Sequence, residues 1–303
     1  MASKLEALAP GSAQSATHLA PYTSFRIGGA ADMLFQPPSM AALSGALAAA
    51  SELSVPVTLL GGGTNVLVSD LGVRGMVVRL AGAFDYIRWG GEQGGAVEVE
   101  AGAAVKLARL VRESVDAGFK GLEFAAGIPG TVGGAALMNA GAFGGEVGDA
   151  IIAMTGVSSL GEVIEHGREN LEFSYRKLAL GGGVMVTSVR FRLLRSPAGS
   201  LRTVVEKIKA KRRRKQPFGL HNAGSVFKNP AGENAGRLIE LAGLKGRVVG
   251  DAEVSTEHAN FIVNRGAARA RDVCDLMSIV QQEVWRRSGV WLEPELRLIG
   301  DWG

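Results

Sequence analysis

The chain has 303 residues, of which 47% are hydrophobic and 20% charged, and its formal net charge is +4. This composition fits a globular protein with a sizeable core, as one large domain or two. The 43 glycines gather in short runs without a strict period, which excludes collagen-like and solenoid architectures. The single cysteine, Cys274, excludes a disulfide framework and suits a reducing cytoplasm.

The N-terminal twenty residues lack a continuous apolar stretch, so no signal peptide is expected there. Residues 24–37 predict a pair of strands around a Gly28–Gly29 turn. A helix follows over residues 39–53, with Ser39 as a suitable N-cap. Residues 55–70 then indicate a buried strand, a glycine loop and a second strand, so the chain begins as a small α/β unit.

The middle of the chain is rich in predicted strands. An amphipathic helix is expected over residues 105–118, ended by Gly118. The composition shifts near residues 195–200, which marks a plausible domain boundary. The expected strands of this region lie within residues 75–80, 86–91, 96–103, 150–166 and 183–194.

Beyond this boundary the pattern predicts a basic helix over residues 201–217, stopped by Pro217. Two more helices and two strands complete the chain. The helices are expected at residues 235–246 and 270–289, and the strands at residues 259–264 and 292–300. The fold class is therefore α+β, with a strand-rich middle and a C-terminal αβ layer.

Residues 124–145 run for twenty-two positions without a charge and contain seven glycines. The length suits a membrane span, but Pro129, Asn139 and the scattered glycines would break or weaken a spanning helix. The segment is therefore either a packed core element or backbone laid bare for a ligand.

A second glycine run, LGGGTN at residues 60–65, directly follows a predicted strand. Such a run lets several backbone N–H groups point one way, which suits a diphosphate. It matches neither the dinucleotide fingerprint nor the phosphate loop. Alone it would more often be a tight turn. Together, the two stretches could line opposite sides of an extended dinucleotide.

The sequence resembles the family of UDP-N-acetylenolpyruvoylglucosamine reductases (MurB) from about residue 21 to 300. The motifs occur in the family's order: SFRIGG, LGGGTNVLVSD, GLEFAAGIPGTVGGAALMNAGAFGGE, FSYR, NAGSVFKNP, AGRLIELAGLKG, HANFIVN and GVWLEPELRLIG. NAGSVFKNP and LEPEL are highly specific, whereas the glycine loops alone indicate only the wider FAD-binding superfamily. The chain is similar to the shorter subgroup, because little room follows FSYR for an extra tyrosine-bearing loop.

The resemblance implies an α+β fold of the vanillyl-alcohol-oxidase/PCMH type. Two FAD-binding subdomains are expected at residues 1–80 and 81–198, and a C-terminal αβ substrate domain at residues 199–303. FAD would be bound without a covalent link, because residues 61–65 and 124–146 contain no His, Cys or Tyr. NADPH would be the hydride donor.

The residues expected to bind the cofactor lie in the two glycine stretches. Ile128–Thr131 would lie near the isoalloxazine and Gly61–Asn65 around the pyrophosphate, while Ala125, Ala136, Leu137 and Met138 would pack in the core. The full set is Gly61, Gly62, Gly63, Thr64, Asn65, Val66, Ala126, Gly127, Ile128, Pro129, Gly130, Thr131, Gly133, Gly134, Asn139, Gly141 and Ala142.

The implied activity is reduction of UDP-N-acetylglucosamine enolpyruvate to UDP-N-acetylmuramate in peptidoglycan precursor synthesis, and hence in cell-wall biogenesis, cell shape and division. NADPH would reduce FAD and leave, and hydride would then reach C3 of the enol ether while a proton reaches C2. Charge develops at C2 and its carboxylate, so the site needs cations, donors and an acid there. The resemblance assigns Arg176 to the carboxylate, Ser225 to proton donation and Glu295 to the developing charge.

The resemblance also suggests substrate contacts: Arg212 or Lys215 at the diphosphate and Asn229 at the uridine end. The basic run at residues 207–215 is otherwise typical of a solvated helix face. Without a recognition module or interleaved aromatic residues, nucleic-acid binding is disfavoured. No membrane partner is expected, and the enzyme should be a cytoplasmic monomer. The four histidines, His18, His166, His221 and His258, lack ligand-like spacing, so no metal site is expected.

Two other functions remain open at this point. The chain could be another FAD-dependent oxidase or dehydrogenase of the same superfamily, acting on an alcohol or lactone, although such an enzyme would not need NAGSVFKNP and LEPEL. It could also be a flavin- or nucleotide-binding module without catalysis. Fast oxidation of a small alcohol by oxygen would favour the first, and bound flavin that NADPH cannot reduce would favour the second.

Overall fold

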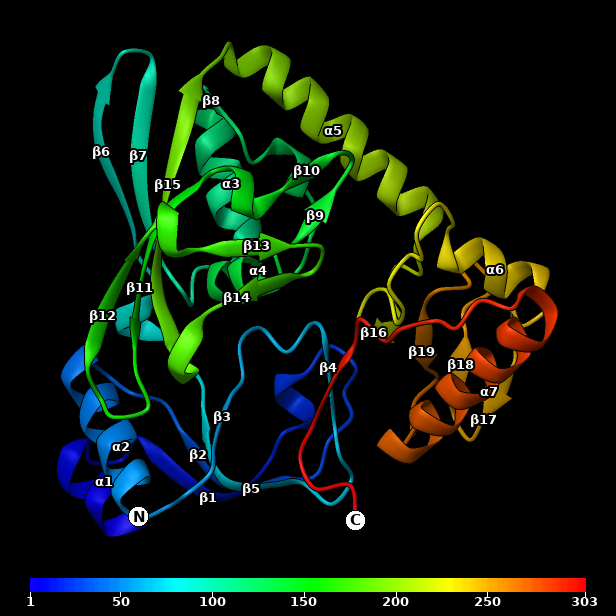
Figure 1. Cartoon of the computed structure of the whole chain (residues 1–303), viewed down its shortest axis with the longest axis horizontal. Helices are drawn as coiled ribbons and strands as arrows, with labels where there is room; N and C mark the ends of the chain where they lie inside the picture. Colours follow the sequence, from blue (N-terminus) through cyan, green and yellow to red (C-terminus); the bar gives the residue numbers. More distant parts are fainter. The chain divides into compact units, whose positions relative to one another are not determined.

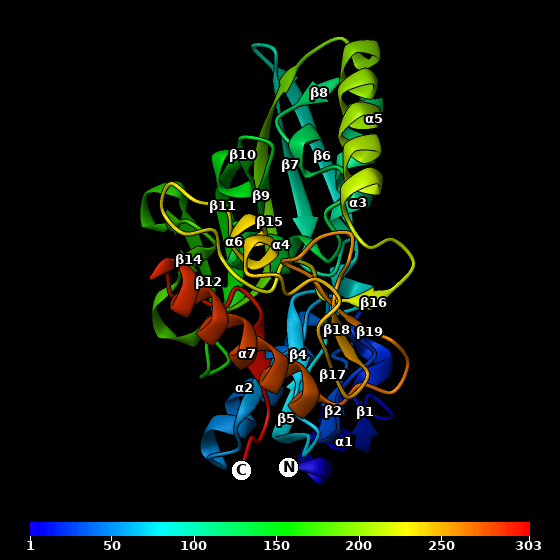
Figure 2. The same cartoon turned by 90° about the vertical axis from the view of Figure 1, so that its right-hand side faces the viewer.

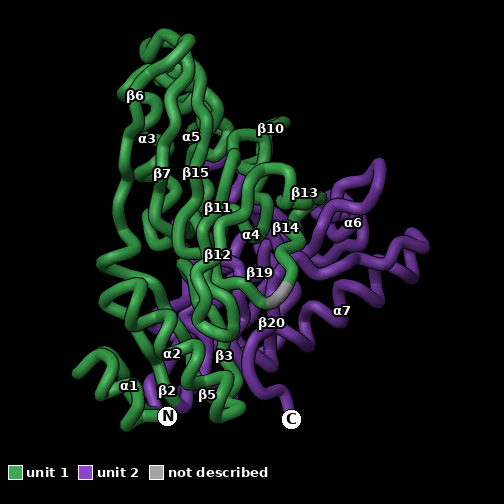
Figure 3. Tube along the Cα trace, turned by 60° about the vertical axis from the view of Figure 1, so that its left-hand side comes forward, with its two compact units in different colours: residues 1–15, 33–62, 75–211 green, residues 16–32, 63–74, 212–303 purple. Residues whose placement is uncertain are grey.

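The computed structural model describes residues 1–181 and 183–303 and separates into two compact units whose chain segments alternate (Figure 3). The first unit contains residues 1–15, 33–62 and 75–211, and the second contains residues 16–32, 63–74 and 212–303. Their boundary passes through the first glycine loop, between Gly62 and Gly63. The threefold division at residues 80 and 198 stays a prediction.

An antiparallel sheet with the order β12-β11-β15-β7-β6 forms the centre of the first unit, and β8 pairs with β15 (Figure 1). Its strands are β6 (Ile87–Gln93), β7 (Ala96–Gly102), β8 (Phe119–Lys120), β11 (Ile151–Val157), β12 (Val163–Gly167) and β15 (Met185–Arg195). Two short hairpins accompany it: β9 (Gly141–Ala142) with β10 (Gly145–Glu146), and β13 (Glu172–Ser174) with β14 (Lys177–Ala179). The strands expected over residues 86–103, 150–166 and 183–194 are confirmed.

Helices α3 (Leu107–Asp116) and α4 (Val132–Leu137) pack against this sheet. The buried positions of α3 recur with the spacing of one helix face, which confirms the amphipathic helix expected there. Helix α5 (Ala198–Lys215) is the long helix at the upper right of Figure 2. It adds Leu201, Val205 and Ile208 to the same apolar core. The expected basic helix is thus confirmed; most of its arginines and lysines are exposed, whereas Lys209 and Arg212 are half-buried.

A second sheet has the order β1-β2-β5-β3, formed by β1 (Ala13–His18), β2 (Ala30–Phe35), β3 (Val57–Leu59) and β5 (Val73–Val78). Helix α2 (Met40–Glu52) begins at the expected N-cap, because the Ser39 hydroxyl accepts a hydrogen bond from the Ala42 N–H at 3.1 Å. The N-terminal helix α1 (Ala2–Leu8) was not expected; it packs on α2 and buries Leu5.

The second unit contains a sheet with the order β16-β19-β18-β17 and a parallel pair of β20 with β4. Its elements are β4 (Val66–Val68), β16 (His221–Asn222), α6 (Ala235–Leu241), β17 (Val248–Val249), β18 (Ala252–Val254), β19 (Ile262–Asn264), α7 (Ala270–Ser288) and β20 (Arg297–Ile299). Asp70 caps α7 across 200 residues of sequence: its carboxylate accepts from the N–H groups of Ala270 at 2.8 Å and Arg271 at 3.0 Å. Gly289 ends α7 in the left-handed conformation.

Three expectations about local structure were wrong or too long. Residues 24–29 do not form a strand, because the Arg26 N–H bonds back to the Thr23 carbonyl and Arg26 has φ +57°, which makes a turn. Helix α6 ends at Leu241, ahead of Gly243 in a left-handed conformation. Of residues 292–300, only β20 is a regular strand.

Candidate active site

The two glycine stretches meet inside the first unit. A Cβ added to Gly62 would lie 2.8 Å from the Gly130 Cα, and one added to Gly61 would lie 3.4 Å from the Thr131 Oγ1. Only glycine permits such a close approach of two backbones. The structure thus brings parts of the two glycine stretches into contact, and their position on either side of a dinucleotide stays a prediction.

Hydrogen bonds to the neighbouring chain hold the second stretch in place. The Leu107 N–H donates to the Gly130 carbonyl at 3.1 Å, and the Gly133 N–H donates to the Ala103 carbonyl at 3.0 Å. Thr131 is the N-cap of α4 and accepts from the Gly134 N–H at 3.4 Å. The core packing expected for Ala125 and Ala136 is confirmed, since both are fully buried.

The predicted cofactor residues differ in their exposure. Gly61, Gly62, Gly127 and Pro129 are exposed, whereas Gly63, Ala126, Gly133 and Asn139 are buried. Gly133 has a packing role, because a Cβ there would lie 2.7 Å from the Ala103 Cβ. The others are half-buried: Thr64, Asn65, Val66, Ile128, Gly130, Thr131, Gly134, Gly141 and Ala142. Their contact with a cofactor stays a prediction.

Arg176 lies in the first unit, at the tip of the β13–β14 hairpin. Ser174 pairs with Lys177, so Tyr175 and Arg176 form a two-residue turn. Arg176 has φ +58°, a conformation that costs a side-chain-bearing residue roughly 1–2 kcal/mol and usually selects glycine or asparagine at this turn position. Its guanidinium stacks on the Tyr175 ring at 4.8 Å and donates from Nη2 to the Gly141 carbonyl at 3.0 Å.

Ser225 and Glu295 lie in the second unit, where backbone pairing brings their segments together. The Glu295 N–H donates at 2.8 Å to the carbonyl of Val226, the residue after Ser225. Phe227 and Pro294 form an antiparallel bridge, and the Lys228 N–H donates to the Glu293 carbonyl at 2.9 Å. Two motifs seventy residues apart thus form one structure. The approach of Arg176 to this pair stays a prediction.

Asn260 supports the same segment and was not singled out from the sequence. Its side chain accepts from the Phe227 N–H at 3.0 Å and donates to the Phe227 carbonyl at 2.8 Å. Its backbone carbonyl accepts from the Val226 N–H at 2.9 Å. The residue is 4% exposed. The motif HANFIVN contains Asn260, but only the structure shows that its amide faces the backbone of the Ser225 segment.

Residues 63–65, the second half of the first glycine loop, lie in the second unit, and Asn65 bonds to the segment around Glu295. The Asn65 amide donates to the Glu295 carbonyl at 3.1 Å, and the Arg297 N–H donates to the Asn65 carbonyl at 3.2 Å. The Gly63 carbonyl accepts from the Ser24 N–H at 2.9 Å. Asn65, a predicted cofactor residue, therefore also positions the backbone of Glu295.

The predicted substrate residues have different surroundings. Burial lowers the pKa of the Arg212 guanidinium, and its Nε is buried without a hydrogen-bond partner among the described residues. Lys215 is exposed at the end of α5. Asn229 accepts from the Ala235 N–H at 3.0 Å, so its carbonyl oxygen already serves the start of α6. A buried guanidinium N–H without a partner favours a ligand that can accept a hydrogen bond, such as an anion.

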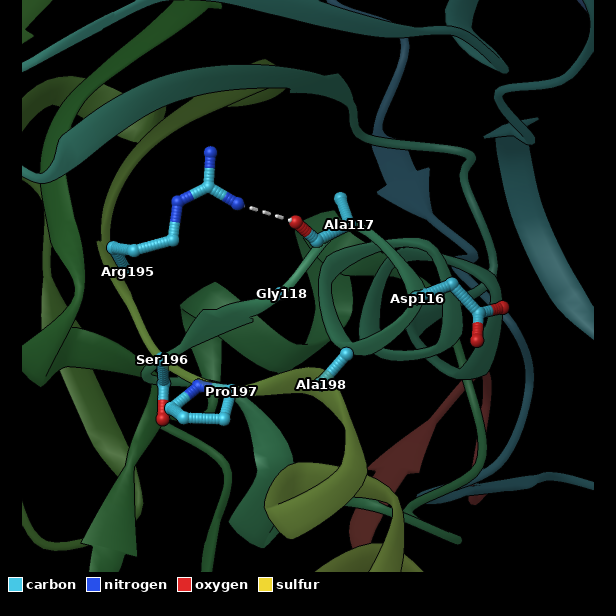
Figure 4. A pocket seen from close by; sticks show the side chains of 7 residues that line it. All are labelled: Asp116, Ala117, Gly118, Arg195, Ser196, Pro197 and Ala198. Atoms are coloured by element: carbon cyan, nitrogen blue, oxygen red, sulfur yellow. Dashed lines mark hydrogen bonds between the residues drawn. The ribbon is translucent and has the colours of Figure 1, made fainter.

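A depression of about 470 Å³ lies elsewhere in the first unit, between the end of α3 and the start of α5 (Figure 4). Arg195 crosses it and donates to the Ala117 carbonyl at 2.9 Å. None of its lining residues belongs to the predicted site. Across residues 1–181 and 183–303, no group of three His, Cys, Asp or Glu side chains could hold a metal ion. In that same part of the chain, no helix is both long and apolar enough to span a membrane.

Comparison with known proteins gives a consistent result. Residues 216–299 match the family described as UDP-N-acetylenolpyruvoylglucosamine reductase, C-terminal domain, and residues 31–167 match an FAD binding domain. The UDP-N-acetylenolpyruvoylglucosamine reductase of Myxococcus xanthus is 44% identical over 302 residues, which cover 99% of this chain and 96% of that protein. The corresponding protein of Agathobacter rectalis is 42% identical and covers 92% and 91%.

The chain belongs to the UDP-N-acetylenolpyruvoylglucosamine reductase family. The crystal structure of the reductase from Thermus caldophilus matches with a TM-score of 0.81 at 39% identity, over 93% of this chain and 97% of that one. A berberine bridge enzyme variant, with a TM-score of 0.50 at 17% identity over 65% of this chain, shares the fold alone. The predicted family, the α+β fold with its FAD-binding unit, and the flavin-dependent oxidoreductase class are confirmed.

Proposed function

We propose that Arg176, Ser225 and Glu295 carry out the family's reaction in this chain, the NADPH-dependent, FAD-mediated reduction of UDP-N-acetylglucosamine enolpyruvate to UDP-N-acetylmuramate. The observation that carries the assignment is the 2.8 Å bond from the Glu295 N–H to the Val226 carbonyl. It supports a shared site for Ser225 and Glu295, whose motifs are far apart in the sequence.

The bare backbone of the first unit fits FAD. Beside the contact of Gly62 with Gly130 lie two uncharged stretches, Gly61–Gly62 and Gly127–Pro129, in which every residue except the half-buried Ile128 is exposed. Backbone N–H groups in such loops suit a pyrophosphate and the edge of a flat ring. Bound there, FAD would carry hydride from NADPH to the substrate. Because these loops lack a nucleophilic side chain, we expect heat or acid to release free FAD, and yellow colour retained by the denatured chain would contradict this.

The three residues act on the charge that the reaction develops in the substrate. Arg176 offers a planar guanidinium that can bind the enolpyruvyl carboxylate with two parallel hydrogen bonds. The strain at Arg176 is consistent with a functional requirement for arginine at that turn. Ser225 Oγ would donate the proton to C2 after hydride reaches C3, and Glu295 would stabilise the charge at C2 and its carboxylate.

Arg212 supports a sugar-nucleotide diphosphate as the remote part of the substrate. Its buried Nε lacks a partner among the described residues, and a diphosphate oxygen would satisfy it with a charge-assisted bond. Lys215, exposed one turn later on α5, would add a second cation. We assign the uridine end to Asn229, through its amide nitrogen, because its oxygen is already bonded to Ala235.

Stopped-flow absorbance tests the assignment by separating the two stages. We expect NADPH to bleach the flavin anaerobically and the enolpyruvyl substrate to restore its colour. In the Ser225→Ala variant, NADPH should reduce the flavin at close to the parent rate. Reoxidation of that flavin by substrate should slow by about 10²–10⁴-fold, the usual contribution of a positioned acid.

Two results would contradict this role of Ser225. Reoxidation as fast as in the parent would show that another group, such as Glu295 or a water, is the acid. Failure of NADPH to reduce the variant would place the hydroxyl in a structural role at the flavin. Fast oxidation by oxygen with a small alcohol as donor would instead indicate an oxidase.

The proposal also includes a cytoplasmic location and a monomeric state. Burial raises the pKa of the Cys274 thiol to about 11, so the single cysteine is a weak nucleophile suited to a packing role. Size-exclusion chromatography with light scattering should give the mass of one chain, 31.5 kDa. A concentration-independent mass of twice this value would show a dimer.

A further inference from the structure

Asn139 occupies an unusual place within the uncharged glycine run. It is 1% exposed and has φ +40°, a conformation that asparagine tolerates better than most residues. Its side-chain oxygen accepts from the Gly148 N–H at 3.0 Å. Its side-chain nitrogen donates to the Glu146 carboxylate at 2.7 Å and to the Ser174 carbonyl at 3.1 Å. Both amide hydrogens and the oxygen are therefore used within the protein.

The bond to Ser174 reaches the residue immediately before the turn that carries Arg176. The β13–β14 hairpin has only three residue pairs, and the left-handed φ of Arg176 opposes its formation. A strained residue keeps its conformation only where the surrounding structure fixes it. The Asn139 amide provides such a constraint, because it holds the backbone at the base of the turn.

Gly141, two residues after Asn139, holds the other end of Arg176. Its carbonyl accepts from Arg176 Nη2 at 3.0 Å. A Cβ at this position would lie 3.0 Å from Arg176 Nη1 and 2.9 Å from the Glu146 Cγ, so the absence of a side chain gives the guanidinium its place. One short segment thus fixes both the backbone and the head group of Arg176.

We propose that Asn139 is a positioning residue for Arg176, acting through its hydrogen bond to the Ser174 carbonyl. This proposal rests on the role of Arg176 in the proposed function. The sequence suggested Asn139 as a cofactor contact, but its side chain is buried and fully engaged with Gly148, Glu146 and Ser174. Any contact with FAD would therefore come from its backbone.

Asn139→Asp tests the role with an isosteric change. The carboxylate cannot donate to Ser174, and it faces the Glu146 carboxylate. We expect reoxidation of the reduced flavin by substrate to slow by about 10²-fold, the cost of a small displacement of a catalytic group. Flavin content and reduction by NADPH should stay close to the parent. The matched control is Asn170→Asp, at an exposed residue of the same unit that also bonds a carboxylate, Glu169, at 3.2 Å, and it should change neither rate.

A double-mutant cycle shows whether Asn139 acts through Arg176. In an Arg176→Ala background, Asn139→Asp should change reoxidation by less than about twofold, because residues that act as a unit are not additive. Full additivity, or loss of flavin from Asn139→Asp, would overturn the proposal. If Arg176→Ala itself left reoxidation unchanged, the catalytic assignment would fail instead, which separates the two ideas.

A second variant separates positioning from stability and remains informative if Asn139→Asp folds poorly. Adding Glu146→Gln to Asn139→Asp reverses donor and acceptor in that pair, which should restore folding. The bond to the Ser174 carbonyl stays lost, so reoxidation should remain slow by a similar factor. Recovery of both stability and reoxidation rate would show that Asn139 has only a structural role and would reject the proposal.

Discussion

Each unit of the molecule uses one buried asparagine to support a predicted catalytic segment, but the two do so differently. In the first unit, Asn139 bonds a carboxylate and a single carbonyl next to a strained turn. In the second unit, Asn260 bonds both the N–H and the carbonyl of Phe227, as a neighbouring strand would. A neutral amide suits both tasks because it offers a donor and an acceptor without a charge to desolvate.

This difference indicates where stability and catalysis can be separated. The Ser225 segment is held by main-chain pairing with residues 293–296 and with Asn260, so loss of the contacts with Asn260 should affect folding and reaction together. Arg176 lies on a short hairpin held by a few side-chain contacts, and its conformation is itself unfavourable. Changes at Arg176 should therefore affect the reaction far more than the fold.

Among the variants that compare the two units, the largest expected effect comes from Arg176→Gly. We expect reoxidation by substrate to slow by about 10²–10³-fold, the usual cost of removing one donor to developing charge. The melting temperature should stay close to that of the parent, because the roughly 1–2 kcal/mol of relieved strain is offset by about 0.5–1 kcal/mol of chain entropy and by the lost bond to the Gly141 carbonyl. Parallel melting curves and stopped-flow traces measure both quantities.

Arg176→Lys is the companion variant. It keeps the strain and one positive charge but loses the planar fork, so its turnover should be low and its melting temperature close to that of the parent. Near-normal turnover of the lysine variant, or clear destabilisation of the glycine variant, would remove the contrast between the two units.

Asn260→Ala should show the opposite balance. It leaves the N–H and the carbonyl of Phe227 buried without these partners, at roughly 1–3 kcal/mol for each group. Urea unfolding measures the loss. Asn234→Ala serves as a calibration, because it removes only the N-cap of α6 and should cost about 1 kcal/mol. A smaller loss at Asn260 than at Asn234 would contradict the account of the second unit.

The Gly62→Ala variant tests whether the glycine loops of the first unit bind FAD. Its new Cβ would lie 2.8 Å from the Gly130 Cα, and overpacking of this kind costs typically about 1–3 kcal/mol. We expect the purified variant to hold less FAD, measured by its visible absorbance per chain. Gly199→Ala on α5 is the matched control, since a Cβ there meets nothing within 4 Å. Full flavin content in Gly62→Ala would exclude these loops as the cofactor cradle.

The smallest effect concerns pH. Burial lowers the pKa of His258 below 6.5, and its Nδ1 accepts from the Asn260 N–H at 3.2 Å, which requires the neutral ring. In the window between the folded pKa and 6.5 the unfolded chain binds more protons, so stability rises with pH there and is fully present above 6.5. Urea midpoints from pH 5 to 8 should show this rise. The rise of the urea midpoint with pH should be weaker in the His258→Gln variant. An equal rise in the variant and the parent would show that other groups cause it.

Much of the local structure follows from the sequence. Helix α7 was predicted over residues 270–289, where the structure shows buried positions with helical spacing and a C-cap at Gly289, and Ser39 was predicted as the N-cap of α2. The failures occur where local patterns are weak. Residues 24–29 have strand-like composition, yet a turn at Arg26 prevents pairing, and α1 lacks a side-chain N-cap that could have indicated it.

The sequence by itself determined the family and the fold class, because those depend on ordered motifs and on hydrophobic periodicity, and it predicted the catalytic residues. Only the tertiary structure decided that Gly62 touches Gly130, that Glu295 bonds the carbonyl beside Ser225, and that Asn139 and Gly141 hold Arg176. These contacts join residues that are distant in the chain. Their geometry is fixed by backbone pairing and close packing within each unit. Contacts of this kind do not produce a periodic pattern in the sequence from which they could be predicted.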